Sequence, residues 1–169
     1  MSASHHIVVV RHGKAEKSAQ GSDQRDYDRH LTERGRADSG AAGAIAGSAL
    51  GEPTGRVVAL VSSAARAVET WQEVAASLPD VVEVDVRDDL YQAGVDDLLA
   101  LMAATAEDVT AVLVVGHDPT MSQTVSTLAG GECELRTAAV AVLSCDGSWA
   151  AIGPDTCRLD SLDVGRAGG

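Results

Sequence analysis

The stretch HIVVVRHG, residues 6–13, decides the fold class. Its valine-rich start is typical of a strand that is buried on both faces, as strands of parallel sheets are. Three further runs have the same character: VVALV at 57–61, VVEVDV at 81–86 and AVLVV at 111–115. The segments between the runs are long enough for helices, so the sequence predicts an α/β protein with a mostly parallel sheet and helices on both faces.

The helices are expected between these strands. We predict them over 32–50, 64–78, 95–104 and 119–128. Ser63 is expected to cap the second helix, and Asp118 the fourth, with Pro119 in its first helical position.

The C-terminal third predicts an antiparallel hairpin at one edge of the sheet. The run AAVAVLS at 138–144 is expected to pair with WAAI at 149–152 across a short turn. The chain should then form a three-layer sandwich in one domain, residues 1–162, followed by a flexible tail at 163–169.

Composition and charge exclude several classes of function. The 169 residues are 45% apolar, enough for one core, and the formal net charge is -12. Such a charge disfavours nucleic acid as a partner. No apolar run approaches the roughly 20 residues that span a membrane. The N-terminal MSASHH has no basic residue and does not resemble a signal peptide, so we expect a cytoplasmic protein.

The three cysteines are Cys133, Cys145 and Cys157. They form an odd set without a C-x-x-C pair or a nearby histidine cluster, so neither a disulfide framework nor a metal site is expected. The prediction is three reduced, inert thiols.

Charged and imidazole side chains follow three of the predicted strands. Arg11, His12 and Gly13 follow the first strand, Arg66 lies shortly after the second, and His117 follows the fourth. Ligands of open α/β sheets bind beyond the carboxyl ends of the strands. Two arginines and two histidines at that edge predict a site for a tetrahedral dianion such as a phosphoryl group.

One of the two histidines is a candidate nucleophile. A neutral imidazole can attack phosphorus when its other nitrogen is held by a hydrogen bond, and Gly13 would let the backbone come close to the phosphate. The arginines and the second histidine would stabilise charge on the phosphoryl oxygens. This chemistry requires no metal and no organic cofactor.

These residues resemble the histidine phosphatase superfamily, whose signature is the R-H-G at 11–13, and within it the short SixA-type phosphohistidine phosphatases. The matching segments are VVVRHGKAE at 8–16, DYDRHLTERG at 26–35, SSAARAVET at 62–70, LYQA at 90–93 and VVGHDPT at 114–120. The resemblance implies His12 as nucleophile and Arg11, Arg66 and His117 as phosphate ligands.

The chain departs from the family pattern at three positions. Ala64 stands where proline is common, and Asp118 where asparagine is common. The third departure bears on the reaction, because Gln92 occupies the place of a glutamate that donates a proton in many relatives, and an amide is no general acid. Nearby alternatives are Asp88, Asp89, Asp96 and Asp97.

The missing acid and the short chain favour one substrate class. An imidazole leaves phosphorus more easily than an alkoxide does, and no insertion is long enough to form a lid over the pocket. We therefore expect a monomer that dephosphorylates phosphohistidine on a protein and releases inorganic phosphate. Lys14 would form a basic rim with Arg29 and Arg34. The alternatives are a phosphatase for a small phosphate ester or nucleotide, and a low-activity module that binds phosphoproteins.

Overall fold

The computed structural model describes residues 4–17 and 25–168. In this part of the chain the strands are β1 (Ser4–Arg11), β2 (Arg56–Ser62), β3 (Val82–Arg87), β4 (Val109–Gly116), β5 (Ala139–Asp146) and β6 (Cys157–Val164). The α-helices are α1 (Glu33–Leu50), α2 (Ala65–Ala75), α3 (Val95–Ala103) and α4 (Thr120–Ala129). Short 3-10 helices are η1 (Asp26–Asp28), η2 (Asp88–Leu90) and η3 (Trp149–Ala151).

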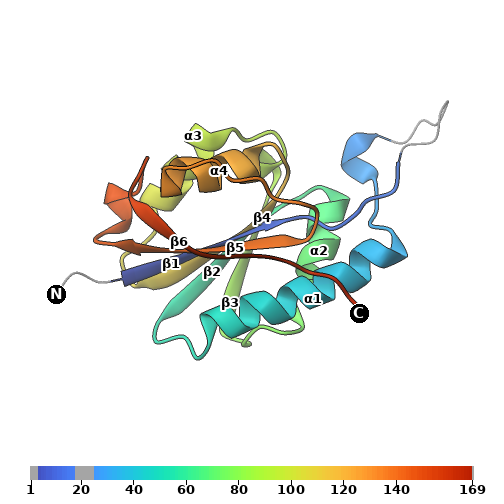
Figure 1. The fold of residues 1–169 in the computed structure, drawn as a ribbon, viewed down its shortest axis with the longest axis horizontal. Helices are drawn as coiled ribbons and strands as arrows, with labels where there is room; N and C mark the ends of the chain where they lie inside the picture. Colours follow the sequence, from blue (N-terminus) through green and yellow to red (C-terminus); the bar gives the residue numbers. More distant parts are fainter. Residues whose placement is uncertain (1–3, 18–24, 169) are drawn as a thin grey trace.

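The strands form one mixed sheet in the order β3-β2-β4-β1-β5-β6. The first four are parallel to one another, whereas β5 is antiparallel to β1 and to β6. Helices α1 and α2 cover one face of the sheet and α3 and α4 cover the other (Figure 1). The predicted three-layer α/β fold is confirmed.

Strand β1 contributes to the core on both faces. Ile7 and Val9 pack with residues of α3 and α4, whereas Val8 and Val10 pack with residues of α1 and α2. All four side chains are fully buried. This double burial explains why the strand is an unbroken apolar run rather than an alternating one.

The hairpin is present, but its second strand was predicted in the wrong place. Residues 149–151 form η3, in which the buried indole of Trp149 donates a hydrogen bond to the carbonyl of Val109 (2.7 Å). The partner of β5 is β6, where exposed and half-buried residues alternate. Val164 is its one β-branched residue, so the pattern that revealed the other strands is missing from it.

The segment expected to be a flexible tail is bonded to the rest of the domain. Asp163 and Val164 belong to β6, so the expected domain boundary at residue 162 falls inside a strand. The amide of Gly165 donates to the carbonyl of Ala138 (2.9 Å), and that of Ala167 donates to the carboxylate of Asp38 on α1 (3.0 Å). Gly169 lies outside the described residues.

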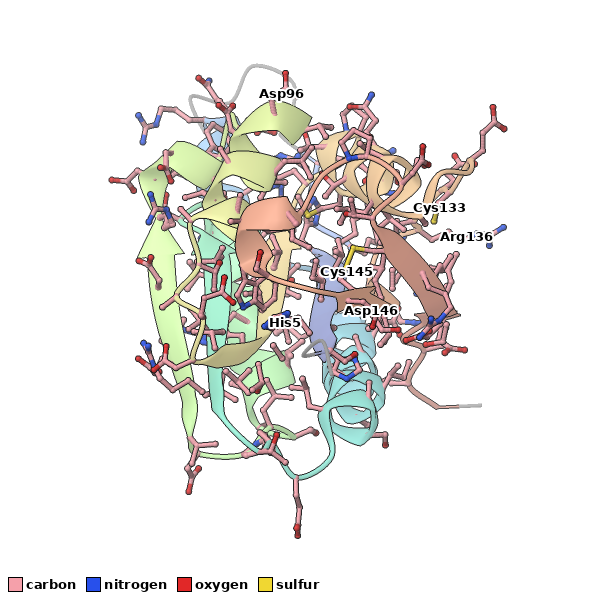
Figure 2. All side chains as sticks on the ribbon, turned by 90° about the vertical axis from the view of Figure 1, so that its left-hand side faces the viewer. His5, Asp96, Cys133, Arg136, Cys145 and Asp146 are labelled. Carbon is pink, nitrogen blue, oxygen red and sulfur yellow. A yellow bond between two sulfur atoms is a disulfide. The ribbon has the colours of Figure 1, made fainter. Side chains whose placement is uncertain are left out.

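Two of the three cysteines form a disulfide, Cys145–Cys157, so the prediction of reduced thiols is wrong for this pair. Figure 2 shows the bond in yellow beside Cys145. The two residues are directly opposite each other in the register of β5 and β6, with their Cα atoms 4.4 Å apart. Because the partner strand was misplaced, the two thiols were not expected to meet. Cys133 is free and half-buried.

The two expected helix caps also differ in detail. Ser63 does not cap α2. The N-cap residue of α2 is Ala64, whose backbone amide donates a hydrogen bond to Ser62 Oγ (3.3 Å). Asp118 acts one residue before the N-cap of α4, where its carboxylate accepts from the backbone amide (3.0 Å) and the hydroxyl (2.7 Å) of Ser122. Among the described helices none is long and apolar enough to cross a membrane.

Candidate active site

The predicted site residues meet at the carboxyl edge of the parallel strands. Arg11 ends β1 and lies beside Gly116 of β4 in the register, so His12 and His117 follow on neighbouring strands. Their ring centroids are 5.2 Å apart. The short helix η1 (blue) lies beyond this edge of the sheet (Figure 1).

The tautomer of His12 is set by its own loop. Nδ1 lies 2.7 Å from the carbonyl oxygen of Gly13, which can only accept a hydrogen bond, so Nδ1 carries the proton and Nε2 keeps its lone pair. Arg66 Nε donates to that lone pair (3.3 Å). Burial lowers the pKa of His12 to about 4, with a further lowering by Arg66 and Arg11 against the opposing effect of the Gly13 bond. The ring is therefore neutral at pH 7.

Arg66 is a buried cation, only 6% exposed, in the first turn of α2. Its backbone carbonyl accepts a hydrogen bond from Thr70 Oγ1 (2.7 Å), and Thr70 in turn accepts from the amide of Gly13 (3.0 Å). Thr70 thus joins the loop that carries His12 to the helix that carries Arg66.

His117 is fixed by Ser62 at the end of β2. Its Nε2 lies 2.7 Å from Ser62 Oγ, and burial, the nearby His12 and Arg66 lower its pKa to about 3. Within the described residues, His117 Nδ1 and Arg11 Nε are buried without a hydrogen-bond partner. Both nitrogens lie in residues predicted to bind phosphate.

Arg11 is tied to the loop before β5. Its Nη1 donates to the carbonyl of Leu135 (2.9 Å) and lies 3.7 Å from the carboxylate of Asp118. The same carboxylate accepts the two bonds from Ser122. The negative charge of Asp118 is thus stabilised by Arg11 and by the start of α4.

Close packing accounts for the glycine of the R-H-G motif. A Cβ on Gly13 would lie 2.5 Å from Ser39 Oγ and 2.6 Å from the carbonyl oxygen of Gly35, closer than atoms can approach. Lys14 has an exposed side chain, and its carbonyl accepts from the amide of Thr32 (2.9 Å) at the start of α1. The loop that carries His12 therefore lies directly on the first turn of α1.

Asp26, on η1, is the main site residue that sequence reasoning missed. Its carboxylate accepts hydrogen bonds from Tyr91 Oη (2.5 Å), Arg66 Nη2 (2.9 Å) and Arg29 (2.8 and 3.0 Å). The Tyr91 hydroxyl, with the two arginines, holds the pKa of Asp26 well below its usual range. Asp26 follows no strand, so the strand-end argument could not find it.

Tyr91 was also missed, although it precedes Gln92. Its ring meets that of His117 edge to face, with centroids 5.6 Å apart, and that of Tyr27 in the same way at 5.1 Å. The Arg66 guanidinium lies 5.9 Å from the Tyr91 ring centroid. Gln92 itself is exposed.

The alternative acids lie outside this hydrogen-bonded cluster. Asp89 forms an ion pair with Arg87 (2.8 Å), and Asp97 accepts from the amide of Gly94 (2.9 Å). Asp88 is exposed, and Asp96 points to solvent from α3 (Figure 2). Residues 4–17 and 25–168 hold no group of three His, Cys, Asp or Glu that could bind a metal ion.

A comparison with protein families decides the classification. The histidine phosphatase superfamily (branch 1) matches residues 7–98. The chain belongs to this superfamily. The matched region contains His12, Arg66 and Tyr91, and His117 lies beyond it. A comparison with curated proteins finds no match.

Three solved structures match the chain over nearly its whole length. A provisionally named phosphohistidine phosphatase SixA from Nakamurella multipartitia is 31% identical, with a TM-score of 0.75 and 96% of each chain covered. A SixA, named in the same provisional way, from Agrobacterium tumefaciens is 28% identical, with a TM-score of 0.76 and 94% and 97% covered. The protein histidine phosphatase SixA complexed with tungstate is 28% identical, with a TM-score of 0.74 and 94% and 96% covered.

Proposed function

We propose that this chain is a phosphohistidine phosphatase that takes the phosphoryl group from a histidine on another protein. The observation that carries the proposal is the state of His12, a neutral ring whose Nδ1 proton is held by Gly13 and whose Nε2 lone pair lies beside Arg66. A nucleophile for phosphorus needs such a lone pair next to a cation that binds the phosphoryl oxygens.

The reaction then has two steps. His12 Nε2 attacks phosphorus while Arg11, Arg66 and His117 bind the equatorial oxygens, and the leaving group departs with the electron pair of its bond to phosphorus. Water next attacks the phosphorus atom, the bond between phosphorus and Nε2 breaks with its electron pair returning to Nε2, and inorganic phosphate leaves with both protons of the water. The two buried nitrogens without partners, Arg11 Nε and His117 Nδ1, support an oxyanion ligand because phosphoryl oxygens would serve as their acceptors.

Two observations favour phosphohistidine over phosphate esters. The SixA structures, whose names state a phosphohistidine or protein histidine phosphatase, match 94–96% of the chain at 28–31% identity. Among the described residues the site also holds no carboxylic acid placed as a proton donor, since Asp26 is held as a carboxylate and Gln92 is an exposed amide. An imidazole leaving group needs such a donor less than an alkoxide does.

The monomeric state and the cytoplasmic location stay predictions. The Cys145–Cys157 disulfide is evidence against the cytoplasmic location, because reducing compartments keep most thiols reduced. Alkylation of this protein in freshly lysed cells would show whether Cys145 and Cys157 are reduced thiols, as a cytoplasmic location predicts, or are bonded to each other.

The test compares three substrates: a protein phosphorylated on histidine, an aryl phosphate and an alkyl phosphate. The enzymes are wild type, His12→Ala and the control His6→Ala, an exposed histidine of the same strand. We expect a strong preference for phosphohistidine, with kcat/KM lowered at least about 10⁴-fold in His12→Ala, as when other enzymes lose their nucleophile. Equal cleavage of alkyl phosphate would instead indicate an ester phosphatase. Absence of turnover on all three substrates would favour the phosphoprotein-binding module, and turnover that persists in His12→Ala would refute His12 as the nucleophile.

A further inference from the structure

Asp26 and His12 are bonded to the same guanidinium group. Arg66 donates from Nε to His12 Nε2 (3.3 Å) and from Nη2 to Asp26 Oδ2 (2.9 Å). A phosphoryl group held by Arg66 and attacked by His12 would therefore lie close to the Asp26 carboxylate. A carboxylate repels a phosphoryl dianion unless the rest of the substrate brings a positive charge.

Asp26 is built to stay ionised. Donors reach it from three elements: Arg29 next to η1, Arg66 on α2, and Tyr91 after η2. His12 and His117, which also lie near Arg66, are both neutral at pH 7. A proton donor must carry a proton before the reaction, so Asp26 is no general acid. The four donors fill its lone-pair sites, so a cationic ring would bind by taking the place of Tyr91 Oη, the one uncharged donor.

Aromatic rings lie next to this carboxylate. The Tyr91 ring is half-buried, its hydroxyl is bonded to Asp26, and Tyr27 and His117 meet it edge to face. These aromatic rings can bind a flat, electron-poor ring, because aromatic faces attract cations and ring edges.

We propose that Asp26 and Tyr91 form the leaving-group subsite, in which Asp26 accepts a hydrogen bond from the protonated imidazole ring of the substrate and Tyr91 packs against that ring. The inference rests on the proposed function and names the residues that select its substrate.

The subsite explains how the first step proceeds without an acid. The substrate ring carries a proton on the nitrogen that is not bonded to phosphorus, and Asp26 stabilises that cation. When His12 Nε2 forms its bond to phosphorus, the phosphorus–nitrogen bond of the substrate breaks and its electron pair stays on the substrate nitrogen. The ring leaves as neutral imidazole with its proton in place, so no proton is transferred. An alkyl phosphate brings no cation, and its dianion meets the Asp26 carboxylate directly.

The test measures kcat/KM of Asp26→Asn on a peptide with phosphohistidine and on p-nitrophenyl phosphate. Loss of a hydrogen bond between charged groups should lower the rate on phosphohistidine about 10- to 100-fold. Hydrolysis of p-nitrophenyl phosphate should fall less than this, because that substrate brings no cation for Asp26 to bind. The control is Asp28→Asn, which removes the same charge from the same short helix and should leave both rates unchanged.

Two further readouts separate a specific contact from a structural effect. In Asp26→Asn the alkaline limb of the pH profile of kcat on phosphohistidine should move to lower pH, since the bound ring would give up its proton more readily. Tyr91→Phe keeps the ring and should retain most of the preference for phosphohistidine, whereas Tyr91→Leu should lose it.

The outcomes distinguish this inference from the function on which it rests. If wild type shows no preference for phosphohistidine, the proposed function fails. If wild type has the preference and Asp26→Asn keeps it, or slows both substrates equally, the leaving-group subsite alone is overturned.

Discussion

Replacing Gly35 by alanine should displace the loop that carries His12. A Cβ at this position of α1 would overlap the carbonyl oxygen of Lys14 and lie 3.0 Å from the Lys14 carbonyl carbon and amide nitrogen. These are backbone atoms, so the loop must move away from the helix. A Cβ on Gly40, in the same helix, would meet no atom within 4 Å, so Gly40 provides the matched control.

The size of the effect follows from two opposing contributions. Alanine stabilises a helix interior over glycine by about 0.5–1 kcal/mol, and overpacking costs typically about 1–3 kcal/mol. The net loss for Gly35→Ala is about 1–2 kcal/mol, which lowers Tm by roughly 2–8 °C in a chain of this length. A shift of about 1 Å in the nucleophile should lower kcat on the order of 100-fold.

The assay combines thermal unfolding with phosphatase kinetics. Gly40→Ala should raise Tm by roughly 1–4 °C, since only the helix preference changes, and should leave kcat as in wild type. If Gly35→Ala behaved like Gly40→Ala, the loop would have room to accept the methyl group, and the predicted displacement of His12 would be wrong.

Three further predictions concern protonation, phosphate binding and the disulfide. His12 must be neutral to act as nucleophile, and burial lowers its pKa to about 4. The kcat/KM on an aryl phosphate, corrected for ionisation of the substrate, should therefore fall only below about pH 4. A fall in kcat/KM near pH 6.5 would contradict the buried environment of His12. Inorganic phosphate at about 100 times its Kd should stabilise wild type by about 2.7 kcal/mol in thermal unfolding, and Arg66→Ala, but not the exposed Arg25→Ala, should abolish the shift. Cys145→Ala should lower the free energy of unfolding by about 2–4 kcal/mol in denaturant unfolding, because the disulfide closes a short loop. It should leave kcat unchanged, since the bond lies at the end of β5 far from His12. A loss of activity without a loss of stability would contradict this.

The fold was predictable where burial alone decides the structure. The apolar runs of β1, β2 and β4 lie between two helical layers, and no solvent-facing residues interrupt them. Strands β3 and β6 both lie at edges of the sheet, but β3 has three valines whereas Val164 is the one β-branched residue of β6, so only β3 showed a strand pattern. The errors over the hairpin and the disulfide share this cause.

The candidate site was predictable only where strand ends supply it. Arg11, His12 and His117 follow strands β1 and β4, and Arg66 lies in the helix after β2, so topology alone brings them to one edge. Asp26 reaches the site through a connection between β1 and α1, and its place depends on the donors that hold it rather than on any periodic pattern. Such a residue is visible only after the chain is folded.

The role of His12 as nucleophile is tested most directly by trapping the phosphoryl group on it. Wild type and His12→Ala would be mixed with a phosphohistidine protein, quenched rapidly in alkali, digested and mapped by mass spectrometry. We expect a transient, acid-labile phosphoryl group on the peptide that contains His12 in wild type, and neither label nor turnover in His12→Ala. Full turnover in His12→Ala, or a label on another residue, would contradict it.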